Sequence, residues 1–220
     1  MFKMVNMCLA GLLILVSSAF GFDDFTRPYI GVFGGSAITS VNKVSDSSGS
    51  LNTDFDPGYL VGLNAGVTFD AMLGMNIERI RSEIEVGYRS NSLVHMKNTQ
   101  GQSANMDGTV SVTNLMLNGY LENTSALSSD QKINLYMTAG VGAAMASISS
   151  VYYQGTTLIK SASDTQLAYQ GGFGIGYDLT KNVTLDAAYK YMGTTTFEFA
   201  GVDAQYGSHN VLFGARYLFK

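Results

Sequence analysis

The sequence predicts an all-β protein, namely an eight-stranded antiparallel transmembrane β-barrel whose strands follow one another as an up-and-down meander. Three observations predict this fold class. Apolar residues recur at every second position in segments of strand length, the polar connections are alternately long and short, and the polar faces hold few charges. The chain of 220 residues is 46% hydrophobic but only 14% charged, whereas soluble globular domains average about 25% charged residues.

The first 21 residues have the pattern of a cleaved signal peptide. Lys3 precedes the apolar residues 8–16, and small residues come before the expected cleavage site. This apolar run is shorter than the roughly 20 residues of a membrane-spanning helix. We therefore expect residues 1–21 to be removed and residues 22–220 to form one exported barrel domain. Cys8, the only cysteine, leaves with the signal peptide, which excludes disulfide and thiol chemistry from the mature chain.

Eight segments of the mature chain are expected to be strands. They are residues 28–40, 58–69, 77–89, 109–121, 132–148, 164–179, 182–196 and 208–219. The first and fourth rest on spacing more than on clean alternation. In the second, apolar residues from Tyr59 to Phe69 face away from glycine, asparagine and threonine. In the third, Ile84, Val86 and Tyr88 alternate with arginine and glutamate.

The later segments alternate more strictly. The fifth, residues 132–148, is the longest apolar stretch after the signal peptide, but polar and glycine residues interrupt it too often for a spanning helix. The sixth alternates through residues 167–179, the seventh through residues 183–191 and the eighth through residues 211–219. Two leucines of the eighth segment, Leu212 and Leu218, interrupt this alternation because they occupy positions of the polar face.

The apolar faces are expected to point outward into lipid, with the polar faces lining the lumen. Small polar-face residues suit the narrow lumen of an eight-stranded barrel, and Tyr177, Tyr189 and Tyr217 lie toward strand ends on the apolar face, as in the aromatic girdles of membrane barrels. Because hydrocarbon offers no hydrogen-bond partner, the sheet must close on itself. An even strand number places both termini on the short-turn side, which is the layout of a bacterial outer-membrane barrel.

Five segments carry a resemblance to a known family, namely RPYIGVFGG, SEIEVGYRSN, AGVGAA, AYQGGFGIGYDLTKNVTLDAAYKYMG and HNVLFGARYLF. They resemble the OmpA-like outer-membrane β-barrel family, and more narrowly its surface-antigen and porin-like small barrels of alphaproteobacterial type. The resemblance implies that the barrel-assembly machinery reads the last strand, where Gly214, Tyr217 and Phe219 match the family's pattern. Leu212 stands where that pattern has a polar residue, and Lys220 follows the terminal aromatic residue.

Eight charged residues on the polar faces are expected to form a salt-bridge network in the lumen. They are Arg79, Arg81, Glu83, Glu85, Asp178, Asp186, Lys190 and Arg216. A buried carboxylate is costly unless it is paired. Strand positions place Asp186 beside Arg216, and Lys190 nearer the level of the two glutamates. We expect this network to plug the barrel, but the same residues fit the filter of a narrow porin, and that alternative stays open.

Other function classes find little support. The formal net charge of −4 argues against a nucleic-acid partner. A third alternative, a lipid-modifying enzyme using Ser208 with His209 or His95, lacks a G-x-S-x-G motif, and adjacent strand residues point to opposite faces. The glycine-rich residues 171–176 lie inside a strand and are not followed by a helix, so they are no phosphate loop. We expect no catalytic residue, cofactor or metal site.

Four long polar connections are the expected contact surface of the protein. They are residues 41–57, 90–108, 149–163 and 197–207. Surface loops commonly carry recognition, so we expect an envelope-structural protein with an adhesin or antigen role toward a host or surface ligand. The other expected partners are outer-membrane lipid and the barrel-assembly machinery, and the protein is expected to be a monomer.

Overall fold

The computed structural model describes ten stretches of the chain. They are residues 26–39, 43–46, 49–70, 77–97, 103–124, 132–149, 151–153, 156–159, 161–199 and 202–219. The expected signal peptide, residues 1–21, lies outside the described residues. Within the described stretches, no helix is long and apolar enough to cross a membrane.

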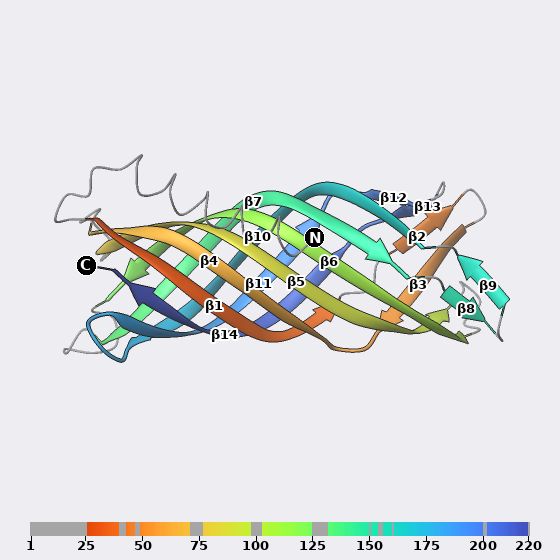
Figure 1. The fold of residues 1–220 in the computed structure, drawn as a ribbon. Coiled ribbons are helices and arrows are strands. Elements are labelled where there is room, and N and C mark those ends of the chain that lie inside the picture. Colours follow the sequence, from red (N-terminus) through yellow and green to blue (C-terminus); the bar gives the residue numbers. More distant parts are fainter. Residues whose placement is uncertain are drawn as a thin grey trace, which may run out of the picture.

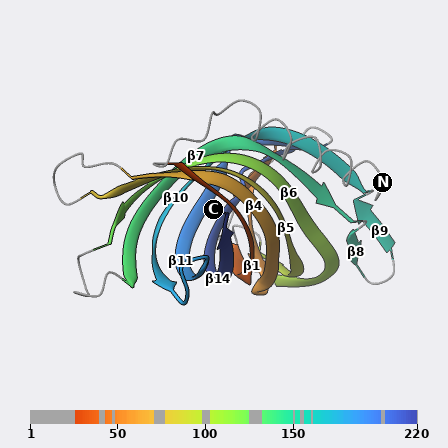
Figure 2. The same cartoon turned by 60° about the vertical axis from the view of Figure 1, so that its left-hand side comes forward.

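Eight long strands form a closed antiparallel barrel (Figures 1 and 2). They are β1 (Thr26–Thr39), β4 (Gly58–Asp70), β5 (Arg79–Lys97), β6 (Ser103–Asn123), β7 (Ile133–Ile148), β10 (Ala162–Asp178), β11 (Val183–Thr194) and β14 (Gly207–Leu218). Each strand pairs with the next one along the chain, and β14 pairs with β1 from Leu218 opposite Tyr29 to Ser208 opposite Thr39. The predicted eight-stranded meander is therefore confirmed, and its seam is the pairing of β14 with β1.

Six short strands extend the sheet at one end of the barrel. They are β2 (Lys43–Asp46), β3 (Gly49–Phe55), β8 (Val151–Tyr153), β9 (Thr156–Ile159), β12 (Phe197–Phe199) and β13 (Val202–Ala204). In Figure 1 they lie on the right, whereas β1 begins and β14 ends on the left. We call the right-hand end the loop end and the left-hand end the short-turn end. The start of β1 and the end of β14 thus share the short-turn end, as the even strand number predicts.

Strand boundaries at the loop end differ from the predicted ones. The predicted strands 77–89 and 109–121 continue into the longer β5 and β6, so that residues 98–102, in place of 90–108, separate them. The other three expected loops contain the short hairpins β2/β3, β8/β9 and β12/β13. Alternating hydropathy marks a strand only where one face meets lipid. Beyond that level the residue types no longer alternate regularly, and backbone pairing continues without the signal.

The two faces of the barrel have the predicted chemistry. Large apolar side chains point outward and are exposed, among them Val32, Leu117, Val141, Phe173 and Phe213. Tyr177 and Tyr217 lie near the short-turn end, whereas Tyr189 sits at mid-strand opposite Phe173, with ring centroids 5.4 Å apart. Tyr189 is therefore not a girdle residue, contrary to the prediction.

The out-of-phase residue Leu212 points into the lumen, where it packs with Ala37 and Leu60 and against Phe33. Phe33 fits there because glycine stands opposite it on both neighbouring strands, at Gly62 and at Gly214. A β-carbon at Gly62 would collide with the Phe33 ring. The lumen therefore contains an apolar layer that the small-residue prediction did not include.

Candidate functional site

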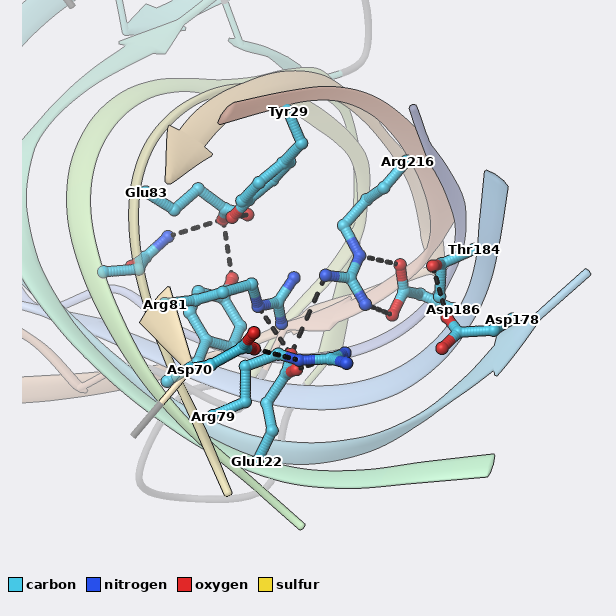
Figure 3. Close-up of polar contacts among 12 residues, drawn as sticks. Tyr29, Asp70, Arg79, Arg81, Glu83, Glu122, Asp178, Thr184, Asp186 and Arg216 are labelled. Carbon is cyan, nitrogen blue, oxygen red and sulfur yellow. Dashed lines mark hydrogen bonds and ion pairs between the residues drawn. The ribbon is translucent and has the colours of Figure 1, made fainter. Parts of the chain in front are cut away.

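The lumen near the short-turn end is organised around the carboxylate of Glu122 on β6, which is fully buried. Arg81 Nε lies 2.7 Å from Glu122 Oε1, Arg216 Nη1 lies 3.7 Å from the same oxygen, and Arg79 Nη1 lies 3.5 Å from Oε2. Figure 3 shows these three guanidinium groups converging on the one carboxylate. We call these four residues the Glu122 cluster.

The Glu122 cluster continues to both sides through further carboxylates. Arg216 donates to Asp186 from Nε at 2.6 Å and from Nη2 at 3.0 Å, a two-pronged pairing that fixes the guanidinium orientation. In the other direction, Asp70 Oδ1 lies 3.6 Å from Arg79 Nε and 3.6 Å from Arg27 Nη2. Arg27 and Asp70 are well exposed, so the series of ion pairs runs from the rim at the short-turn end into the lumen.

A second ion pair lies above the Glu122 cluster, toward the loop end. Lys190 Nζ on β11 donates to Glu85 Oε2 on β5 at 2.7 Å. Asn118 donates to the same oxygen at 3.1 Å, and Gln170 donates to Glu85 Oε1 at 3.3 Å. Neutral donors thus complete the coordination of the buried carboxylate, as a charge in a low-dielectric interior requires.

Glu83 is held by neutral groups. Its Oε2 accepts from the Tyr29 hydroxyl at 2.7 Å, and its Oε1 accepts from the Tyr120 hydroxyl at 2.6 Å and from Asn118 at 3.3 Å. Among the described residues, no cation lies within ion-pair distance of Glu83. The Arg81 guanidinium instead stacks on Tyr120, 3.9 Å from the ring centroid.

The structure brings six of the eight expected lumen charges into ion pairs and leaves two outside them. The six are Arg79, Arg81, Glu85, Asp186, Lys190 and Arg216. The expected pairing of Glu83 with a cation is wrong because tyrosine hydroxyls fill its coordination. The expected pairing of Asp178 is wrong as well, since this residue accepts from the Thr184 hydroxyl at 2.5 Å.

Sequence reasoning missed Glu122 because this residue follows the end of the predicted strand 109–121. The alternation of the strand nevertheless extends to Glu122. This residue points into the lumen, as Asn118 and Tyr120 do at every second position before it, and all three are buried. Arg89 was also left out of the expected network, although it lies on the same face of β5 as Arg81 and is buried.

The remaining lumen is nearly filled. A cavity of about 40 Å³ lies among Arg81, Glu83, Asp186, Lys190 and Arg216, and a volume of this size holds a few water molecules. Toward the loop end, buried side chains form what we call the upper apolar cluster. Its members are Val112, Met116, Ala144, Ala146, Ala168, Met192, Phe197 and Tyr206.

The residues of the expected assembly signal lie at the β14–β1 seam. Gly214 faces the lumen opposite Phe33. Tyr217 and Phe219 are exposed on the outer surface, with ring centroids 5.2 Å apart in an edge-to-face arrangement. The Phe219 amide donates to the Pro28 carbonyl at 2.9 Å, which extends the pairing beyond β14. Lys220 lies outside the described residues.

Ser208 and His209 point to opposite sides of the barrel wall. Ser208 is buried in the lumen and donates to Asn210 Oδ1 at 2.9 Å. His209 Nδ1 lies on the outer side, 2.5 Å from the Tyr189 hydroxyl. The two residues therefore cannot act as a nucleophile and its base. His95 belongs to β5, where its backbone pairs with Asp54. Within the described residues, no cluster of histidine, cysteine, aspartate or glutamate side chains is arranged to hold a metal ion.

Comparison with known proteins finds a matching family and several similar solved structures. The family described as the outer membrane protein beta-barrel domain matches residues 7–219. Solved structures with a similar fold include Neisserial surface protein A, with 18% identity, a TM-score of 0.49, and coverage of 87% of this chain and 97% of that one. OprG from Pseudomonas aeruginosa has 14% identity, a TM-score of 0.47, and coverage of 89% and 97%. The attachment invasion locus protein Ail of Yersinia pestis has 17% identity, a TM-score of 0.39, and coverage of 88% and 99%.

No curated protein matches the sequence. The family match spans almost the whole chain, and the closed barrel with its apolar outer surface is the architecture that this family requires. The chain therefore belongs to the outer membrane protein beta-barrel family and is a protein of the bacterial outer membrane.

Proposed function

We propose that this protein is a surface protein of the cell envelope, in which a plugged barrel holds a sheet outside the membrane for adhesion or immune contact. The filled lumen is the observation that carries this proposal. The Glu122 cluster, the Lys190–Glu85 pair and the upper apolar cluster occupy successive levels between the two ends. A solute would have to displace buried ion pairs and apolar side chains at every level.

The length of the strands at the loop end supports the contact role. β5 has 19 residues and β6 has 21, whereas a tilted strand crosses a bilayer in about 9–11 residues. The excess extends beyond the membrane and pairs with β3 and β8. The protein thus offers an ordered β-surface to the outside, which favours binding to a component of a host or of another cell over passage of solutes.

Purified protein in planar lipid bilayers is expected to show no resolvable single-channel steps, because the proposed plug would leave no continuous water path. Controls are an empty bilayer and an established porin inserted under the same conditions. Steady steps from the wild-type protein would contradict the plugged-barrel proposal and favour the narrow porin, which is the second candidate function. The measurement is single-channel current in a symmetrical potassium chloride solution.

Cells that display the protein are expected to adhere to host cells or matrix proteins through the loop end. Replacing residues 98–102 and residues 43–55 by short glycine-serine turns should reduce adherence to the level of cells without the protein. The matched control replaces residues 179–182, the turn at the short-turn end, and should leave adherence unchanged. Heat-modifiable gel mobility verifies that each variant forms the barrel. Unchanged adherence in the first variant would contradict the contact role.

A further inference from the structure

Arg89 on β5 is a buried cation that the plug does not use. Its side chain lies among the upper apolar cluster and is 2% exposed. Among the side chains that the structure describes, no carboxylate lies within ion-pair distance of its guanidinium group. A buried charge without a counterion is strongly unfavourable, and an ionisable residue at membrane depth commonly marks a functional site.

The donors of Arg89 are poorly matched by acceptors. Nη2 donates to Asn114 Oδ1 at 3.2 Å, which is its one regular hydrogen bond to oxygen. Nη1 faces Met192 Sδ at 2.6 Å, and a thioether sulfur is a weak acceptor. Nε has no hydrogen-bond partner. A guanidinium group has five N–H donors, so most of the N–H groups of Arg89 have no regular acceptor.

Two neighbours of Arg89 add further unused donors at the same place. Asn114 Nδ2 is buried without a partner, while the Oδ1 of the same amide faces the guanidinium. The Tyr206 hydroxyl interacts electrostatically with Arg89, but it is buried and makes no regular hydrogen bond. Two groups that can donate hydrogen bonds, Asn114 Nδ2 and the Tyr206 hydroxyl, therefore lie beside the guanidinium group. An acceptor with a negative charge would satisfy them together with the unused donors of Arg89.

We propose that Arg89, Asn114 and Tyr206 form an oxyanion site that binds the carboxylate or phosphate group of a small ligand entering from the loop end. The fork of an arginine matches two oxygens of such a group. Asn114 and Tyr206 supply the remaining donors. The apolar walls, including Val112 and Met192, strengthen these contacts because they exclude water.

Tyr206 is the last residue before β14, on the loop-end side of Arg89. It is tied to Thr194 at the end of β11 by a backbone hydrogen bond of 3.0 Å from the Thr194 amide to the Tyr206 carbonyl. The neighbouring residues Gln205 and Thr195 are exposed. The site thus adds a ligand to the proposed surface protein and does not depend on the adhesive role.

Arginine side-chain Nε–H resonances of isotopically labelled protein in micelles provide the test. Sodium acetate or sodium phosphate is titrated in at constant ionic strength, with sodium chloride as the balancing salt. One resonance, absent from the Arg89→Met variant, is expected to shift and saturate. If the shift saturates at a lower concentration of acetate than of phosphate, the site binds carboxylates. If it saturates at a lower concentration of phosphate, the site binds phosphate groups. Arg27→Met, at the exposed rim of the short-turn end, is the matched control and should keep the response.

Two further variants separate the site from a general salt effect. Tyr206→Phe keeps the ring and removes the hydroxyl, so it should weaken binding about tenfold or more. Arg89→Lys keeps the charge but loses the two parallel N–H groups of the guanidinium, so it should also bind more weakly than the wild type. A linear response, an equal response to chloride, or a saturable response that survives in Arg89→Met would overturn the proposal. Arg89→Met is expected to assemble, since an apolar side chain suits this cluster, and Arg89→Lys serves if it does not.

Discussion

The free energy of unfolding of the barrel is expected to fall by about 3–5 kcal/mol when Glu122 is replaced by glutamine, because breaking a buried ion pair leaves uncompensated charge. Three arginines converge on this carboxylate, and Arg81 and Arg216 are almost fully buried. Glutamine retains the volume of glutamate but not its charge. Urea unfolding of the protein in lipid vesicles, followed by tyrosine fluorescence, measures the change.

Asp70→Asn is the matched control for this substitution. Asp70 also contacts two arginines, Arg27 and Arg79, but it is 54% exposed, at the rim. An exposed ion pair contributes about 0–1 kcal/mol, so the control should lose little stability. Equal losses in Asp70→Asn and Glu122→Gln would show that burial of the Glu122 cluster does not matter. A triple variant with methionine at positions 81, 122 and 216 should recover part of the loss, because it removes the charges together.

Removal of residues 217–220 is expected to abolish barrel assembly altogether. Tyr217 pairs with Ile30 of β1 and with Val183 of β11, and the Phe219 amide donates to Pro28. Without these residues the seam is left open at the short-turn end, and unpaired backbone groups are not tolerated in hydrocarbon. The measurement is the heat-modifiable gel mobility of the outer-membrane fraction, in which the folded band should be missing.

Deletion of Lys220 alone is the control for this truncation and should leave assembly intact or improve it. The double variant Tyr217→Ala/Phe219→Ala separates backbone pairing from recognition of the aromatic rings, since it retains the whole strand. Loss of the folded band in this variant would support the proposed assembly signal. Normal insertion of the double variant would contradict it.

The barrel strands could be predicted from sequence because lipid imposes one chemistry on every second residue. In β10 the residues Leu167, Tyr169 and Phe173 are all exposed, while Ala168 and Gln170 between them are buried. The hairpins at the loop end could not be predicted in this way. There, β3 pairs with β5 through residues such as Asn52 and Lys97, whose types carry no alternating pattern.

The lumen was predictable only in part, because alternation tells which side chains point inward but not what each one meets. Arg216 and Asp186 are neighbours across adjacent strands, so their pairing followed from register. Glu122 lies beside Arg79 and Arg81 of the neighbouring strand, but it also reaches Arg216 across the barrel, which register between adjacent strands does not show. The tyrosines that hold Glu83 look apolar in a hydropathy pattern. Leu212 appeared to be an irregularity of the strand and is instead part of the interior.

Two of the ion pairs join opposite sides of the cylinder. Going around the barrel, β14 and β6 are separated by equally many strands in either direction, and so are β11 and β5. Arg216 reaches Glu122 across the first of these diameters, and Lys190 reaches Glu85 across the second. A tube held by backbone hydrogen bonds alone can flatten into an ellipse without breaking any of them. Ion pairs that cross the lumen along two diameters, at different heights, resist that flattening. The charges in the lumen therefore stabilise the circular cross-section of the barrel against lateral pressure from the membrane.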